Sequence, residues 1–216
     1  MTGLISAREL FRAAYQNRYT WDANFPGYSA DVQLKQGDEL YTGKVCINSN
    51  LSVEVIDISD GQIQESLYTQ LRDVVTQRQH NPFEQAHGRN HFNLGTTDEI
   101  GAIAILVDND AMGSNYKVRN NEICQVNRVI GRMAFTIDHK RTLQTGEGYI
   151  SSRYDAVFRN PQTNATIRVL NFEDTYEKIG HYYVLTHQVV WSHEQGQQTI
   201  TEINFANVKL LAPAIV

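Results

Sequence analysis

The sequence predicts an α+β fold: one large, curved antiparallel β-sheet, shaped like a half-barrel, with an N-terminal helix and a second helix packed on it. Its 216 residues include 11 tyrosines and 8 phenylalanines but only 4 prolines, a balance that suits long uninterrupted strands. Two segments in the first third have the apolar spacing of helices. From His91 onward, alternating segments separated by short turns indicate an antiparallel meander.

The first helix is expected to begin after Ser6, because Glu9 stands three residues later, as a capping box requires. Four apolar residues then follow at helical spacing: Ala7, Leu10, Phe11 and Ala14. This helix should end near Tyr19. A second helix should begin at Ser59 or Asp60 and continue to about Arg78, with Pro82 closing the element.

The remaining regular segments are predicted as strands, because polar and apolar residues alternate or because a short apolar run lies between turns. They are Tyr28–Lys35, Glu39–Asn48, Leu51–Ile58, Ile100–Val107, Asn115–Arg119, Glu122–Ile130, Met133–Lys140, Tyr149–Arg159, Ala165–Tyr176, His181–His193 and Gln198–Leu211. No linker, repeat or low-complexity tract divides the chain. Residues 1–216 are therefore expected to form a single domain.

The charge is −5 overall and argues against a nucleic-acid partner. Its distribution is uneven: Lys117–Arg168 holds nine basic and four acidic residues, a local +5, so the remainder carries −10. No apolar run approaches the roughly 20 residues of a spanning helix. The N-terminus lacks the pattern of a signal peptide, and two cysteines are too few for a disulfide framework. We therefore expect a cytoplasmic protein that does not span a membrane.

Two loops imitate ligand-binding motifs. Gly37–Val45 has one residue too many between its glycines for a phosphate loop, and Val45 replaces the magnesium-binding hydroxyl, so a hairpin turn explains it. Asp108–Gly113 begins like a calcium loop, but Met112 and Arg119 replace two required oxygen ligands. An acidic turn is the better interpretation.

No catalytic, metal or cofactor site is predicted. His181, His187 and His193 share a strand face but span about 20 Å, too far to chelate one ion. Between His87 and His91, Gly88 weakens the helix that would pair them. Ser114 lacks the second glycine of a nucleophile elbow, and Cys46 and Cys124 fall in strands. Three acidic residues, Glu173, Asp174 and Glu177, are interpreted as hairpin-edge charges.

The basic stretch offers a candidate binding site. Its arginines lie on adjacent predicted strands and could meet on one face, where they would hold a lipid head group, another anion or an acidic protein: Arg128, Arg132, Arg153, Arg159 and Arg168. Alternatively they pair across strands with Glu147, Asp155 and other acidic residues. Nearby aromatics either line a concavity or fill the core: Tyr149, Tyr154, Tyr183 and Trp191. The candidate ligand-binding residues are Arg128, Arg132, Arg153, Tyr154, Tyr183 and Trp191.

Two segments, Met112–Lys117 (MGSNYK) and Asn171–Gly180 (NFEDTYEKIG), resemble an uncharacterised family found mainly in cyanobacteria, over nearly the whole chain. That resemblance, to a domain of unknown function, implies no catalytic residues. The order of elements is also loosely similar to the half-barrel fold of bacterial lipoprotein carriers. This looser resemblance implies a pocket for lipid-like molecules, by analogy of fold alone.

Three functions follow, in order of preference. The first is a non-enzymatic binder or carrier of an apolar or amphipathic small molecule, held on the concave face of the sheet. The alternative is a protein-interaction or assembly factor that uses the basic strand face to bind an acidic partner. An enzyme of unidentified chemistry comes third, because no pair of residues suggests acid–base chemistry.

Overall fold

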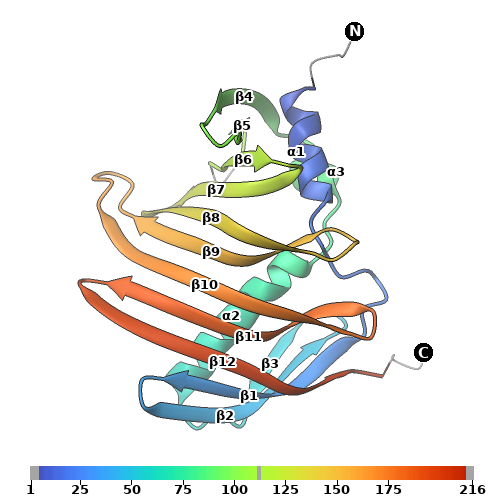
Figure 1. Cartoon of the computed structure of the whole chain (residues 1–216), viewed down its shortest axis with the longest axis vertical. Coiled ribbons are helices and arrows are strands. Elements are labelled where there is room, and N and C mark those ends of the chain that lie inside the picture. Colours follow the sequence, from blue (N-terminus) through green and yellow to red (C-terminus); the bar gives the residue numbers. More distant parts are fainter. Residues whose placement is uncertain (1–4, 111–112, 213–216) are drawn as a thin grey trace. The chain divides into compact units, whose positions relative to one another are not determined.

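The computed structural model describes residues 5–110 and 113–212, and Figure 1 shows their arrangement. Twelve strands form one open sheet in the order β3-β2-β1-β12-β11-β10-β9-β8-β7-β6-β5-β4. From β4 onward every strand lies beside its neighbour in sequence, as a meander requires. This architecture confirms the predicted class, α+β with one large antiparallel sheet.

The three helices of the described chain are α1 (Ala7–Gln16), α2 (Gly61–Arg78) and α3 (Phe83–His87). The first six strands are β1 (Gly27–Gln36), β2 (Glu39–Asn48), β3 (Val53–Ile56), β4 (His91–Thr97), β5 (Ile103–Asp108) and β6 (Asn115–Arg119). The other six are β7 (Glu122–Ile130), β8 (Met133–Gln144), β9 (Tyr149–Arg159), β10 (Thr166–Ile179), β11 (Tyr182–Glu194) and β12 (Gln197–Leu210).

The chain folds into two compact units. Unit 1 comprises Met1–Tyr19, Asn81–Phe172 and Ser192–Gln198, and so contains α1, α3, β4 to β9 and the first half of β10. Unit 2 comprises Thr20–His80, Glu173–Trp191 and Thr199–Val216, with α2, β1 to β3, the second half of β10 and most of β11 and β12.

The core of unit 1 is an aromatic cluster beneath α1. The predicted capping box is present, with the Ser6 side chain accepting from the Glu9 amide and the Glu9 carboxylate accepting from Ser6. Phe11 is fully buried, and its ring centroid lies 4.4 Å from that of Tyr116 on β6. The other buried members are Ala7, Ala14, Tyr15, Phe83, Ile105, Val107, Val118 and Ile123.

The first helix ends earlier than predicted, at Gln16 instead of Tyr19. The following residues leave the helix to pair with β9: the Tyr19 amide donates to the Tyr149 carbonyl, and the Tyr149 amide donates to the Asn17 carbonyl. Gly148 permits this close approach, because a Cβ there would lie 2.5 Å from the Asn17 carbonyl oxygen.

Local turns explain two further differences from the predicted elements. Pro82 does not simply close the second helix; it occupies the N-cap position of the short helix α3, which was not predicted from the sequence. The strand expected from Ile100 begins at Ile103, because the Asp98 carboxylate accepts from the amides of Ile100 and Ala102 and holds a turn. Short helices and side-chain turns leave little periodic signal in a sequence.

Unit 2 has its own core between α2 and its strands. Asp60 caps α2 by accepting from the amides of Gln62 and Ile63. The apolar side of α2 is buried, with Leu67, Leu71, Val74 and Val75 almost inaccessible. Alternate residues of β1 and β12 are buried as well: Tyr28, Ala30, Val32, Leu34, Ile203 and Phe205. This core confirms the helix and strand periods predicted for these segments.

Candidate functional site

One face of β7 to β10 in unit 1 carries a series of partly exposed apolar side chains. Strand register places Arg128 opposite Phe135 and Phe135 opposite Phe158. Because side chains alternate along a strand, every second residue joins this face. We call it the apolar face, and it comprises Val126, Arg128, Ile130, Met133, Phe135, Ile137, Tyr154, Ala156, Phe158, Arg168, Leu170 and Phe172.

Ring contacts confirm that β10 contributes to the apolar face. The Tyr154 and Phe172 rings stack with centroids 4.5 Å apart. The Arg168 guanidinium lies over the Phe158 ring, 4.9 Å from its centroid, and the Phe135 and Phe158 centroids are 6.1 Å apart. Such contacts stabilise side chains that the sheet alone would leave loosely ordered.

Burial changes along the apolar face. Ile130 and Met133, at the hairpin between β7 and β8, are 50% and 36% exposed. Phe135 and Phe158 are half-buried, and Ala156, Tyr154 and Phe172, further along the strands, are only 5–8% exposed. The face therefore runs from an exposed apolar end to a closely packed aromatic end.

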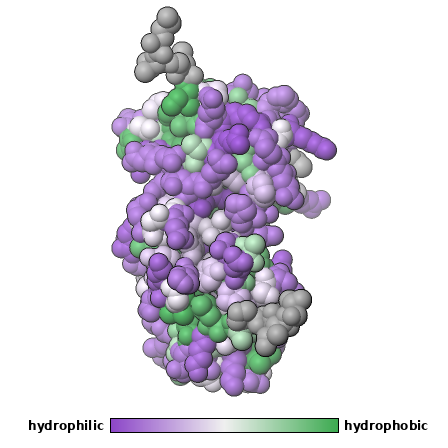
Figure 2. Space-filling view, turned by 90° about the vertical axis from the view of Figure 1, so that its right-hand side faces the viewer, coloured by the Kyte–Doolittle hydropathy of each residue, from purple (hydrophilic) through white to green (hydrophobic). Residues whose placement is uncertain are grey.

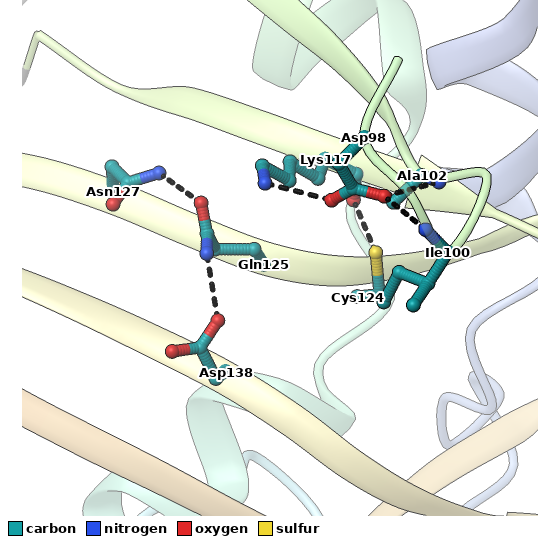
Figure 3. A network of polar contacts seen from close by, with 8 residues as sticks. All are labelled: Asp98, Ile100, Ala102, Lys117, Cys124, Gln125, Asn127 and Asp138. Carbon is teal, nitrogen blue, oxygen red and sulfur yellow. Dashed lines mark hydrogen bonds and ion pairs between the residues drawn. The ribbon is translucent and has the colours of Figure 1, made fainter.

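The opposite face of the same strands, which we call the polar face, carries a hydrogen-bonded row of polar side chains together with exposed apolar ones such as Val129 and Ile167. Gln125 on β7 donates to the Asp138 carboxylate at 2.7 Å, and Asn127 donates to Gln125 at 2.8 Å (Figure 3). Nearby, Lys117 forms an ion pair with Asp98 at 2.8 Å. The row of polar side chains continues on β9, where the Asp155 carboxylate accepts from the Asn171 amide and lies 3.5 Å from the Lys140 Nζ atom. These bonds are typical of a solvated sheet face.

The predicted arginine cluster is divided between the two faces. Arg128 and Arg168 lie on the apolar face, whereas Arg153 and Arg159 point to the polar one. Arg132 lies in the exposed turn between β7 and β8. No carboxylate in the described chain forms an ion pair with any of the five, so cross-strand pairing with Glu147 or Asp155 is not observed.

Arg128 is the most unusual of these arginines. Its Nε atom is buried and has no hydrogen-bond partner among the residues described. The pKa of His87 in α3 is lowered to about 4 by burial first and then by Arg18, with Asp110 opposing the shift and Arg128 and Arg8 adding smaller contributions to it. An anion near Arg128 would reduce this uncompensated charge.

The six predicted ligand-binding residues have different surroundings. Arg128 and Tyr154 share the apolar face, while Arg153 and Arg132 do not belong to it. Tyr183 and Trp191 belong to unit 2, at half-buried positions of β11 that alternate with the buried Val184, Gln188 and Val190. The Tyr183 carbonyl accepts from Trp21 Nε1 at 3.0 Å.

Sequence reasoning missed three aromatics of the apolar face: Phe135, Phe158 and Phe172. Phe135 and Ile137 alternate with the polar Thr136 and Asp138, which could have indicated their shared face. Only strand register reveals that Phe135 lies beside Phe158 from the next strand.

A second polar cluster lies buried in unit 2. Asp174, only 3% exposed, accepts from Gln188 at 2.8 Å and from the Tyr176 hydroxyl at 3.2 Å. The Arg78 guanidinium lies 5.7 Å from the Tyr176 ring centroid. Burial, followed by the Asp174 charge, raises the pKa of Tyr176, which keeps its proton. The interpretation of Asp174 as a hairpin-edge charge was wrong, because the strand continues and turns this side chain inward.

The other candidate nucleophiles and metal-ligating side chains lie in surroundings that suit a structural role. Burial raises the pKa of both Cys46 and Cys124, which disfavours the reactive thiolate. Ser114 is fully buried. The His187 Nε2 atom lies 2.9 Å from a carboxylate oxygen of Glu202, whereas His181 and His193 are exposed. No group of three or more metal-ligating side chains occurs within residues 5–110 and 113–212.

The two motif-like loops resolve as turns where they are described. Gly37, at φ +60°, lies in the hairpin that joins β1 to β2, as predicted. In the calcium-like loop, Asp110 accepts from the Ser114 amide at 2.7 Å, while Ala111 and Met112 lie outside the described residues. The end of the loop therefore has the hydrogen bonding of an acidic turn.

Residues 3–211 match the family described as "Protein of unknown function (DUF3386)". The chain belongs to this family. Recognition of an uncharacterised family from the sequence is thereby confirmed. A search of curated proteins finds no match.

Solved structures similar to this DUF3386 protein include a domain provisionally described as an outer membrane lipoprotein-sorting protein from Vibrio parahaemolyticus. The identity is 11% and the TM-score 0.40, covering 95% of this chain and 92% of that one. MucB in complex with MucA(peri) has 9% identity and a TM-score of 0.25, over 95% and 99% of the two chains. The Pseudomonas aeruginosa MucA/MucB complex gives 10% identity and the same TM-score and coverage.

No helix of the described chain is both long enough and apolar enough to cross a bilayer. The side that Figure 2 displays is mainly hydrophilic, with hydrophobic residues gathered in separate patches. Cytoplasmic location stays a prediction.

Proposed function

We propose that this DUF3386 protein is a non-enzymatic binder or carrier of an apolar or amphipathic small molecule, which it holds on the apolar face of β7 to β10. The observation that carries this proposal is the incomplete burial of Phe135, Ile137 and Phe158 on a face whose far end is closely packed. Aromatic and aliphatic side chains left partly in water on one sheet face are typical of binding surfaces.

The energetics favour a ligand with an apolar part of moderate size. Covering apolar surface contributes roughly 25 cal/mol per Å², so burying about 200 Å² of the face supplies about 5 kcal/mol before the entropic cost of association. Side chains of the face that already contact one another, such as Phe135 and Phe158, require little reordering on binding. Binding of this kind needs no reactive group.

Native mass spectrometry of protein purified from its own host tests the proposal first. We expect a mass above that of the polypeptide, with the excess lost on denaturation and recovered as a small amphipathic molecule. A polypeptide mass alone, together with no uptake of added amphiphiles, would contradict a carrier function.

A pair of variants locates the site. Phe158 and Val157 are adjacent on β9 but point to opposite faces. We expect Phe158→Asp to reduce binding of the neutral dye Nile red at least tenfold, and Val157→Asp to leave it within about twofold. Equal effects of the two variants would mean that the dye does not bind on the apolar face.

The exposed hairpin between β7 and β8 supports a second candidate, an assembly factor that binds an acidic protein. Arg132 is exposed there without an ion pair, close in sequence to the exposed Val129, Ile130 and Met133. This candidate predicts that Arg128→Glu with Arg132→Glu releases a co-purified protein while Phe158→Asp does not. Unchanged retention of that partner in the double variant would count against it.

A further inference from the structure

Four side chains form a continuous row across the apolar face. Arg128 on β7 lies opposite Phe135 on β8, Phe135 lies opposite Phe158 on β9, and the Arg168 guanidinium from β10 covers the Phe158 ring at 4.9 Å. Two neighbouring aromatic rings are thus flanked on each side by an arginine. Neither arginine has a carboxylate partner in the described part of the chain.

The row lies between the exposed and the buried ends of the face. On one side are Ile130 and Met133, paired across the β7–β8 hairpin and partly exposed. On the other side are the nearly buried Ala156, Tyr154 and Phe172. A molecule lying along the strands would therefore meet closely packed apolar groups on the inner side of the row and solvent-exposed apolar groups on the outer side.

Arg128 requires an anion more than Arg168 does. The Arg168 guanidinium is already stabilised by the Phe158 ring. Arg128 instead has a buried Nε without a hydrogen bond, and a partly buried guanidinium without a counter-ion is costly. A carboxylate can accept from Nε and a terminal nitrogen of one guanidinium at once.

We infer that the ligand is a single-chain amphiphile with an anionic carboxylate head group. The head group binds Arg128 beside the Phe135–Phe158 pair, and the apolar chain extends along the strands over the half-buried Ile137. This inference rests on the proposed function, since it names the chemistry of the molecule held on the same face. A carboxylate fits because its single negative charge matches the single guanidinium of Arg128, whose Nε has no hydrogen bond.

Calorimetric titration with three ten-carbon amphiphiles tests the inference: decanoate, a neutral decyl glycoside and decyltrimethylammonium, all below their micelle concentrations. We expect decanoate to bind about tenfold more tightly than the glycoside, and the cation more weakly than both. Arg128→Gln should abolish the preference for decanoate and leave glycoside binding within about twofold. Arg168→Gln should reduce the preference by a smaller factor.

Arg153→Gln is the matched control, because it removes the same charge from the opposite face of β9. It should keep the decanoate preference. If decanoate and the glycoside bind equally to the wild type, or if Arg153→Gln lowers the preference as much as Arg128→Gln, the head-group inference fails while the carrier function stands. If none of the three amphiphiles binds, the carrier function itself fails. Arg128→Lys, which keeps the positive charge, should retain part of the decanoate preference, and unchanged glycoside binding by Arg128→Gln shows that this variant is folded.

Discussion

In unit 2 the alternate residues of β1 and β12 are almost completely buried in the core to which α2 contributes, whereas Phe135, Ile137 and Phe158 at alternate positions of β8 and β9 in unit 1 stay partly exposed. Both faces are rich in aromatic and branched apolar side chains. In unit 2 the buried stripe of α2 completes the core, and Arg78 at its end reaches the Tyr176 ring. Strand composition alone therefore does not distinguish a core from a binding surface.

The largest expected effect is on the buried face of unit 2. Leu71→Ala removes a side chain that is 1% exposed, so we expect the free energy of unfolding to fall by about 3 kcal/mol in urea titrations followed by circular dichroism. Ile137→Ala on the apolar face should cost only about 1 kcal/mol, because that side chain already contacts solvent. Equal costs would show that the two faces are packed alike.

The buried polar cluster of unit 2 comes next. Asp174→Ala leaves the Tyr176 hydroxyl and the Gln188 amide without this acceptor, so we expect a loss of roughly 2–3 kcal/mol in the free energy of unfolding. The exposed Glu177 on the same strand is the control, and Glu177→Ala should change stability by no more than about 0.5 kcal/mol. Unchanged stability of Asp174→Ala would mean that water replaces the lost acceptor in this cluster.

Acid should weaken unit 1 through His87. Its pKa is lowered from 6.5 to about 4 in the folded chain, mainly by burial among aromatic rings, so the unfolded chain binds the proton first as pH falls. The stability that neutral His87 contributes is fully present above pH 6.5 and is lost between pH 6.5 and 4, by roughly 1–2 kcal/mol given its partial exposure.

The variant His87→Phe checks this pH dependence. Its unfolding free energy should change less than that of the wild type between pH 7 and about 4.5, measured in urea at both values. His91→Phe, an exposed position just beyond α3, should keep the wild-type pH dependence. If the unfolding free energy of His87→Phe falls with pH as much as that of the wild type, groups other than His87 cause the effect.

The smallest effect on stability is expected at the exposed end of the apolar face. Ile130→Ser and Met133→Ser remove side chains that are already 50% and 36% exposed, so thermal unfolding should shift by less than about 2 °C. Uptake of an amphiphile should nevertheless weaken by about threefold, because these residues border the entrance to the face. Loss of stability without loss of binding would reverse the roles assigned to the two faces.

Local sequence patterns account for most of the secondary structure and for the fold class. The capping box at Ser6, the apolar spacing in Gly61–Arg78 and the strand alternation were sufficient, because each depends on neighbours within one turn or one strand. Four strands, β2, β6, β7 and β9, begin and end where the alternation predicted. Elements held by local hydrogen bonds, such as α3 and the Asp98 turn, were missed or misplaced.

Which side chains share a face depends instead on the pairing of strands that are distant in the sequence. Arg128 and Arg153 carry the same charge and lie 25 positions apart, yet register and strand parity place them on opposite sides of the sheet. The same register brings Phe135 beside Phe158, and the continued strand β10 turns Asp174 into the core of unit 2. Such pairings depend on bulges and hairpin lengths between distant strands, and a shift of one residue would reverse every side chain.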